Sequence, residues 1–392
     1  CQGNGGLLIA DNTALTEFAA FSSLERSAGD VCVLDLGSQL DNGGGSTEDL
    51  QALFPTEAAT ASSVVSFPAL RQVDGGIEVS YSSQLNAITF PELRRAEFLY
   101  VNSSSWSETA YNDTFEELSL PKLQDVGYFQ VNGNCGFERL NAPRLTSAYY
   151  LFLDANCNGS AAASAEFDLD ALESVYYLSF YVYTDPSGSR PVQLNVPALT
   201  EAEQVSLSVY GDGITDISFP ELQRVNWLYT TFASSTLASL RFPKVETMST
   251  LNLSVQPSEG QDPPTALALI DFSKLESADT IYLNAPIAVV NQNSGLRMPN
   301  LTTVGTYDSN EDNQPDNNGV AQLCTGYSAS DEPPYVNAAC GVMQKLVNSG
   351  YSGEPDTCSQ CDLAGPMGSL KALQVVASYE HSCALLTDGT VS

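Results

Sequence analysis

Residues that could bind a metal ion lie together in one acidic segment, 308–319. Oxygen-bearing side chains occupy its first, third, fifth and ninth positions. This spacing, with a backbone carbonyl at the seventh position, is typical of a calcium loop. Two departures are Asn313 at the sixth position, where Gly is usual, and Gly319 at the twelfth, where an acid is usual. The sequence predicts either calcium binding or a solvated acidic linker; the calcium ligands would be Asp308, Asn310, Asp312 and Asp316.

Nine cysteines favour an oxidising, extracellular setting, because cytosolic proteins seldom keep structural disulfides. Cys1 could pair with Cys32 across the first turn of the fold. Alternatively, Cys1 is the lipid-modified first residue of a bacterial lipoprotein, which would leave Cys32 unpaired. A local group of four is expected to form disulfides in a C-terminal cap: Cys324, Cys340, Cys358 and Cys361.

Catalytic chemistry has little support in the sequence. His381 is the only histidine, so a nucleophile activated by a second histidine cannot be built. Pairs of carboxylates carry no information in a chain with 47 acidic residues. We therefore predict a protein that is not an enzyme, with a polysaccharide lyase or hydrolase as the alternative from that class.

The charge balance limits the partners. A net charge of −32 and a pI near 4.1 exclude nucleic acid and anionic membrane surfaces as expected partners, since both need a basic face. No run of about 18 apolar residues is present, so no transmembrane helix is expected. Because the chain begins at Cys1 and carries no secretory signal, we interpret it as a mature or trimmed product.

A repeated skeleton must position these residues. In the copy that starts at Phe90, apolar side chains follow at offsets 0, 3, 6, 9 and 11, and Pro stands at offset 1. A fixed skeleton that returns every 22 to 30 residues indicates a solenoid. The copies begin at Phe67, Phe90, Leu120, Ala142, Leu169, Val196, Phe219, Phe242, Phe272 and Met298.

The skeleton predicts an all-β fold, a parallel β-solenoid of about 10–11 coils between residues 7 and 307. Offsets 9 and 11 alternate as a half-buried strand does, so stacked coils would align these strands into a parallel sheet. Cys135 and Cys157 each lie 15 residues after the start of consecutive copies. Equal phase places them about 4.8 Å apart, within disulfide range, so we predict this bridge.

The pattern FPxLxxVxxLxV, with Asn102, Asn132 and Asn284 after the strand, resembles the receptor L domain and related solenoids of fungal and bacterial surface proteins. The resemblance covers roughly residues 7–307, within a domain assigned to residues 1–307, and implies a leucine-rich-repeat-like solenoid at a cell surface. It implies no particular ligand, because such repeats are used for many partners.

The remaining chain divides into two further segments. Residues 308–369 are expected to form an acidic loop and a Cys-rich cap, with a helix over 331–350. Residues 370–392 resemble the opening of a regulator-of-chromosome-condensation repeat, the blade unit of a β-propeller. The resemblance gives His381 a structural role and places the partner of Cys383 beyond Ser392. The matching residues are Val376, Ala377, His381, Ser382, Cys383, Ala384, Leu385, Asp388, Gly389 and Thr390.

Aromatic residues recur beside the inward positions of successive coils and are expected to point away from the core. Such a stripe either packs on itself to stabilise the sheet or forms a surface for a protein or a sugar. The predicted ligand-binding residues are Phe98, Tyr100, Tyr128, Tyr150, Phe152, Tyr177, Trp227, Tyr229 and Tyr282.

These patterns together predict an extracellular or cell-surface adhesion module that recognises a protein or a carbohydrate through its aromatic face. The first alternative is a structural stalk or filament subunit that self-associates through the same face. The second is the polysaccharide-acting enzyme.

Overall fold

The computed structural model describes strands and the turns between them. The described residues are 7–10, 23–34, 63–80, 85–102, 115–132, 137–157, 164–184, 191–234, 236–255, 268–284, 295–298, 300–301, 303–304, 320–324, 372–377 and 382–386. They belong to two compact units, residues 1–214 with 219–222, and residues 215–218 with 223–392. Within these ranges every regular element is a β-strand. None of the described residues lies in a helix long and apolar enough to span a membrane.

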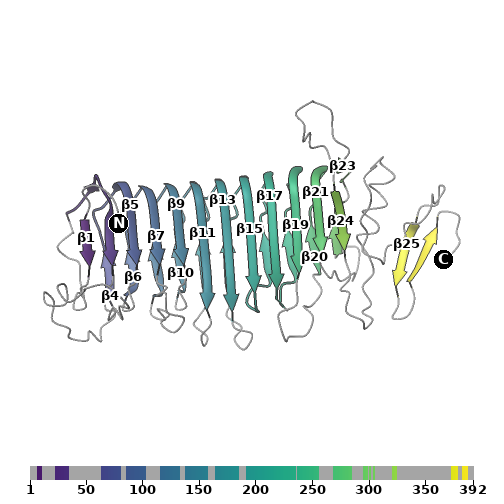
Figure 1. The fold of residues 1–392 in the computed structure, drawn as a ribbon, viewed down its shortest axis with the longest axis horizontal. Helices are drawn as coiled ribbons and strands as arrows, with labels where there is room; N and C mark the ends of the chain where they lie inside the picture. The colour runs from purple at the N-terminus through teal and green to yellow at the C-terminus, as the bar shows by residue number, and fades with distance from the viewer. Residues whose placement is uncertain are drawn as a thin grey trace, which may run out of the picture. The chain divides into compact units, whose positions relative to one another are not determined.

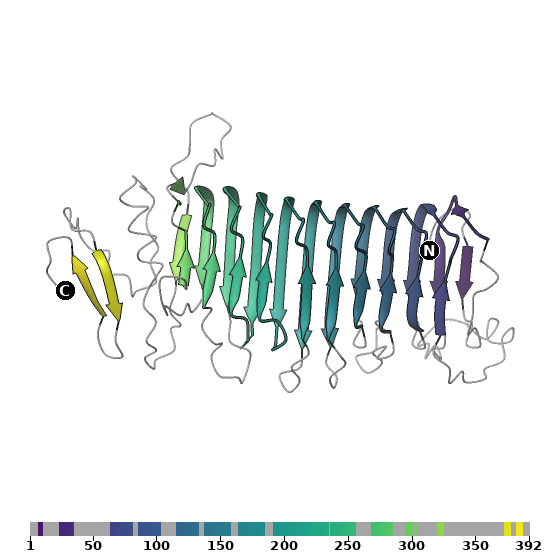
Figure 2. The same ribbon diagram turned by 180° about the vertical axis from the view of Figure 1, so that it is seen from behind.

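The first unit contains two parallel sheets, which Figures 1 and 2 show from opposite sides. The larger sheet has the order β1 (Leu7–Ala10), β3 (Val31–Leu34), β5 (Gln72–Ser80), β7 (Arg95–Asn102), β9 (Asp125–Asn132), β11 (Ser147–Cys157), β13 (Ser174–Thr184) and β15 (Glu201–Tyr210), and β2 (Arg26–Ser27) also pairs with β5. The smaller sheet has the order β14 (Val192–Asn195), β12 (Ala165–Asp168), β10 (Arg139–Asn141), β8 (Glu117–Ser119), β6 (Leu85–Thr89) and β4 (Ser63–Ser66). From β3 onward the strands of the two sheets alternate along the chain, so each of these turns of the solenoid contributes one strand to each sheet.

The second unit repeats this arrangement. Its larger sheet contains β17 (Arg224–Ala233), β19 (Thr247–Val255), β21 (Ser277–Asn284), β23 (Thr303–Val304) and β24 (Val320–Cys324), the last two both paired with β21. Its smaller sheet has the order β16 (Asp216–Ser218), β18 (Ser239–Arg241), β20 (Leu269–Asp271) and β22 (Gly295–Arg297). Strand β24 belongs to the segment that the sequence assigned to the cap, so parallel pairing continues as far as Cys324. Further along, β25 (Ala372–Ala377) and β26 (Ser382–Leu386) form an antiparallel pair.

The Pro of the skeleton lies in a tight turn between the two sheets. The amide of Leu145 donates a hydrogen bond to the carbonyl of Ala142 at 3.1 Å, which closes a four-residue turn over offsets 0 to 3. The same bond joins Leu123 to Leu120 at 3.1 Å, and it joins Leu172 to Leu169 at 3.0 Å although Asp170 stands in place of Pro there. Pro favours the second position of such turns because its ring fixes the φ angle there. The FPxL motif, with Asp170 or Ser273 in place of Pro in two copies, therefore marks the corner between the two sheets.

The predicted inward positions form the core. In the copy that starts at Phe90, all five side chains at offsets 0, 3, 6, 9 and 11 are buried, and the same holds for the copy that starts at Ala142. Equivalent side chains stack from coil to coil: the rings of Phe67 and Phe90 lie 5.3 Å apart and nearly parallel. The parallel β-solenoid is confirmed.

The smaller sheet was not predicted. Each of its strands in the first unit has only three to five residues. Strands β8 and β10 each bury a single side chain between two that are partly or fully exposed. Such segments are too short to show a period of two. The predicted helical cap at 331–350 lies outside the described residues.

The register of β9 and β11 has the equal phase on which the predicted disulfide rests, and the disulfide itself stays a prediction. Leu153 pairs with Val131, an offset of 22 residues along the chain, which is also the separation of Cys135 and Cys157 in the sequence. Cys157 is the last residue of β11, whereas Cys135 lies outside the described residues. A non-reducing peptide map is expected to recover the two cysteines linked. Finding both alkylated in the unreduced protein would contradict this prediction.

Candidate binding surface

The predicted aromatic residues of the first unit stand in register on neighbouring strands. Phe98 on β7 pairs with Tyr128 on β9, which pairs with Tyr150 on β11, which pairs with Tyr177 on β13. A second row runs beside it through Tyr100, Gln130, Phe152 and Ser179. The sequence was therefore right to place these residues at equivalent positions of successive coils.

Six rings on β9, β11 and β13 touch one another and form what we call the aromatic surface. Tyr149 stacks on Tyr176 with ring centroids 4.6 Å apart and planes 14° from parallel. Tyr149 also meets the edge of Tyr150 at 4.7 Å, and Phe152 lies 5.1 Å from Tyr177. The members of the aromatic surface are Tyr128, Tyr149, Tyr150, Phe152, Tyr176 and Tyr177.

The aromatic surface faces solvent while the residues between its rings face the core. Tyr149 and Tyr176 are 52% and 43% exposed, and the other four rings are half-buried. In contrast, Leu151 and Leu178, which follow these rings on β11 and β13, are fully buried. An exposed group of contiguous rings is uncommon on a soluble protein and is typical of a contact site.

Tyr128 is a member of the aromatic surface with a polar side chain, Gln130, beside it on β9. Its hydroxyl donates a hydrogen bond to the side-chain oxygen of Gln130. Burial, and to a lesser degree the neighbouring Tyr100, raises the pKa of the Tyr128 phenol above its usual value. The phenol therefore stays neutral and able to donate throughout the physiological pH range.

Phe98 has a different role from the rest of its row. A Cβ atom on Gly76, the residue opposite Phe98 on β5, would lie 2.0 Å from the Phe98 ring. The ring therefore lies across the backbone of β5. Among the predicted aromatic residues, Phe98 is therefore a packing residue, and it requires glycine at position 76.

The predicted residues of the second unit are more scattered. Trp227 on β17 pairs with Thr250 on β19, and Tyr229 pairs with Asn252, which pairs in turn with Tyr282 on β21. Polar residues thus separate Tyr229 from Tyr282. Tyr282 is 36% exposed and Trp227 is half-buried.

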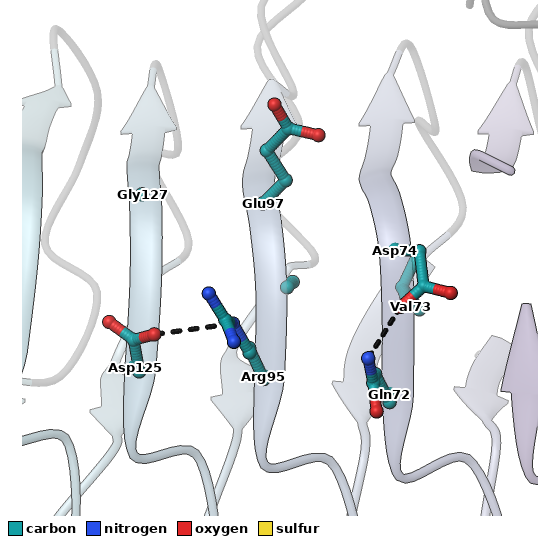
Figure 3. A pocket seen from close by; sticks show the side chains of 8 residues that line it. Gln72, Val73, Asp74, Arg95, Glu97, Asp125 and Gly127 are labelled. Carbon is teal, nitrogen blue, oxygen red and sulfur yellow. Dashed lines mark hydrogen bonds and ion pairs between the residues drawn. The ribbon is translucent and has the colours of Figure 1, made fainter. Parts of the chain in front are cut away.

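A groove of about 510 Å³ lies on the larger sheet of the first unit, over β5, β7 and β9 (Figure 3). The Arg95 guanidinium pairs with Asp125 at 3.3 Å across β7 and β9, and Gln72 donates a hydrogen bond to Asp74. Glu97 extends away from the Arg95–Asp125 pair. The lining residues are Gln72, Val73, Asp74, Arg95, Ala96, Glu97, Asp125 and Gly127.

Sequence analysis did not identify several aromatic residues of the larger sheet as candidates. Offsets 6 and 9 are three residues apart, so two consecutive residues, at offsets 7 and 8, lie between the inward positions. We named only the offset-8 residues, Tyr150 and Tyr177, although Tyr149 and Tyr176 precede them. Farther along β13, Tyr181 and Tyr183 have ring centroids 5.7 Å and 6.5 Å from that of Tyr210 on β15.

The predicted calcium ligands and most predicted disulfide residues lie outside the described residues. Among the residues that the structure describes, no cluster of His, Cys, Asp and Glu could hold a metal ion. Cys32 in β3 is disulfide-bonded. Cys324 ends β24 at the edge of the second unit's larger sheet.

Comparisons of this chain with protein-family models, with curated proteins and with solved structures find no match. The function must therefore be inferred from the residues and their geometry.

Proposed function

We propose that this chain is an extracellular or cell-surface binding module whose partner, a protein or a carbohydrate, docks on the aromatic surface. The six contiguous rings on β9, β11 and β13 carry this proposal, because the core below them is complete without the two most exposed ones. Tyrosine suits such a role: its ring offers apolar area and its hydroxyl offers a hydrogen bond. Buried aromatic anchors supply most of the energy in many interfaces.

The finer identity of the fold belongs to the same proposal. We infer a receptor L-domain-like solenoid, because the FPxL corner and the buried offsets reproduce the skeleton on which that resemblance rests. We further infer that residues 370–392 open a propeller blade, a reading that the antiparallel pairing of β25 with β26 supports. A surface location, calcium in the 308–319 loop and disulfides complete the proposal; the bonded state of Cys32 favours the disulfide alternative over a lipid at Cys1.

Self-association is the second candidate, since the same exposed rings could contact another copy of the chain. A partner that binds two copies through their aromatic surfaces would give the same ring burial. The two functions differ in their dependence on protein concentration.

The experiment is a binding screen with immobilised oligosaccharides and surface proteins, run with the intact chain and with the variant Tyr149→Ala/Tyr176→Ala. A ligand that binds the intact chain and is lost in the variant supports the proposal. Sedimentation of both proteins over a range of concentrations tests self-association. If the intact chain sediments as an assembly and the variant as single chains, the structural-subunit function replaces the binding module.

A further inference from the structure

The residue beside Tyr149 on the neighbouring strand has no side chain. Ala148 pairs with Val126 and Tyr150 pairs with Tyr128, so Tyr149 stands level with Gly127 on β9. A Cβ atom at position 127 would lie 2.5 Å from the backbone oxygen of Glu97 on β7. Because backbone atoms cannot move aside cheaply, this position must stay glycine. No side chain of β9 therefore stands between Tyr149 and Glu97 at this level, and we call this place the slot.

One wall of the slot is an aromatic face. Tyr176 on β13 covers one face of the Tyr149 ring. The ring separation of 4.6 Å is close to the spacing of adjacent strands, so the rings stack along the direction that joins the strands. The opposite face of Tyr149 is therefore directed toward β9, over Gly127, and about half of the side chain is exposed.

The other wall is acidic. Glu97, at the equivalent offset on β7, is exposed and belongs to the groove that ends at Gly127 (Figure 3). The groove lining contains three carboxylates, Asp74, Glu97 and Asp125, against one cation, Arg95. Arg95 is paired with Asp125, and Asp74 is paired with Arg26 at 3.4 Å. Glu97 is therefore the remaining carboxylate of the groove, and its charge can pair with a ligand.

We propose that the slot between Tyr149 and Glu97 receives an arginine or lysine side chain from a basic segment of a partner protein. This inference rests on the proposed function and names the class of partner. The two walls are two strand spacings apart, roughly 9–10 Å, which accommodates a flat guanidinium stacked on the ring and paired with the carboxylate. The net charge of −32 attracts such a segment and repels anionic glycans.

The same rings could stack on a neutral sugar, but the charge of the groove would then contribute nothing. Gln at position 97 separates the two chemistries, because it keeps hydrogen-bonding capacity and loses the charge. Citrulline separates them on the ligand side, since it replaces the guanidinium of arginine with a neutral urea group of the same shape.

The test measures binding of a fluorescent oligo-arginine peptide to the full chain at about 0.15 M salt. Glu97→Gln is expected to weaken binding about tenfold, Tyr149→Ala by at least as much, and the oligo-citrulline peptide is expected to bind far more weakly. The matched control is Glu116→Gln, which removes one exposed charge beside β8 of the smaller sheet and is expected to change binding less than about twofold.

Equal losses in Glu97→Gln and Glu116→Gln would overturn the inference, because the peptide would then bind to the overall negative charge. Binding of a neutral oligosaccharide that survives Glu97→Gln but not Tyr149→Ala/Tyr176→Ala would also overturn it, while the proposed function would stand. If no ligand from the screen and neither peptide depends on Tyr149 and Tyr176, both the inference and the proposed function fail.

Discussion

Replacing Tyr149 and Tyr176 together with alanine is expected to abolish partner binding while the protein stays folded. The two rings contact each other and Tyr150, and they are 52% and 43% exposed. An aromatic pair contributes about 0.5–1.5 kcal/mol beyond its buried area, so the loss of stability should stay near 1–2 kcal/mol. Loss of two central anchors typically weakens an interface by 100-fold or more, since single hot-spot residues contribute about 2 kcal/mol or more.

Tyr282→Ala provides the control for this prediction. Tyr282 is 36% exposed and lies on β21 of the second unit, outside the aromatic surface. Its removal should leave binding unchanged. If Tyr149→Ala/Tyr176→Ala instead unfolds the protein as severely as a core substitution, the rings are packing residues, and the aromatic surface is not a partner surface.

Leu151→Ala is expected to lower the free energy of unfolding by about 2–5 kcal/mol. Leu151 is fully buried and lies in register with Phe129 on β9 and Leu178 on β13, both also fully buried. Truncating it leaves a cavity between three consecutive coils, and the two neighbouring strands are held by their own hydrogen bonds and cannot close it.

Because each coil of a solenoid contacts mainly its neighbours, the destabilisation should be local at first. Hydrogen exchange is the appropriate measurement: amides of β9, β11 and β13 should exchange faster in Leu151→Ala, and amides of β5 should change little. Ser179→Ala, at an outward position of β13, should leave exchange unchanged. Equal protection in Leu151→Ala and Ser179→Ala would contradict the position of Leu151 in the core.

The parallel solenoid could be predicted from the sequence because each coil repeats the same inward positions. Phe90, Leu93 and Leu99 are representative: the spacing in the sequence fixes which side chains point inward, and all three are buried. The role of Pro also follows from the sequence once the hydrogen bond between offsets 0 and 3 is known. Short strands such as β10, with one buried Leu140 between Arg139 and Asn141, give too little pattern to predict a second sheet.

The site was predicted only in part, for a physical reason that lies in the spacing of the skeleton. A strict alternation places one outward residue between two inward ones, whereas offsets 6 and 9 leave two. Tyr149 and Tyr176 occupy the additional position, which on β9 is Gly127. The slot over Gly127 could not be predicted, because it depends on the close approach of Gly127 to the Glu97 backbone.

The most direct test of the binding surface is nitration of tyrosines by tetranitromethane, mapped by mass spectrometry, with and without the partner found in the binding screen. Tyr149 and Tyr176 should react readily in the free chain and become protected in the complex, while Tyr282 reacts equally in both states. Equal nitration of Tyr149 and Tyr176 in the free and bound protein would contradict the account, because the partner would then occupy another part of the chain.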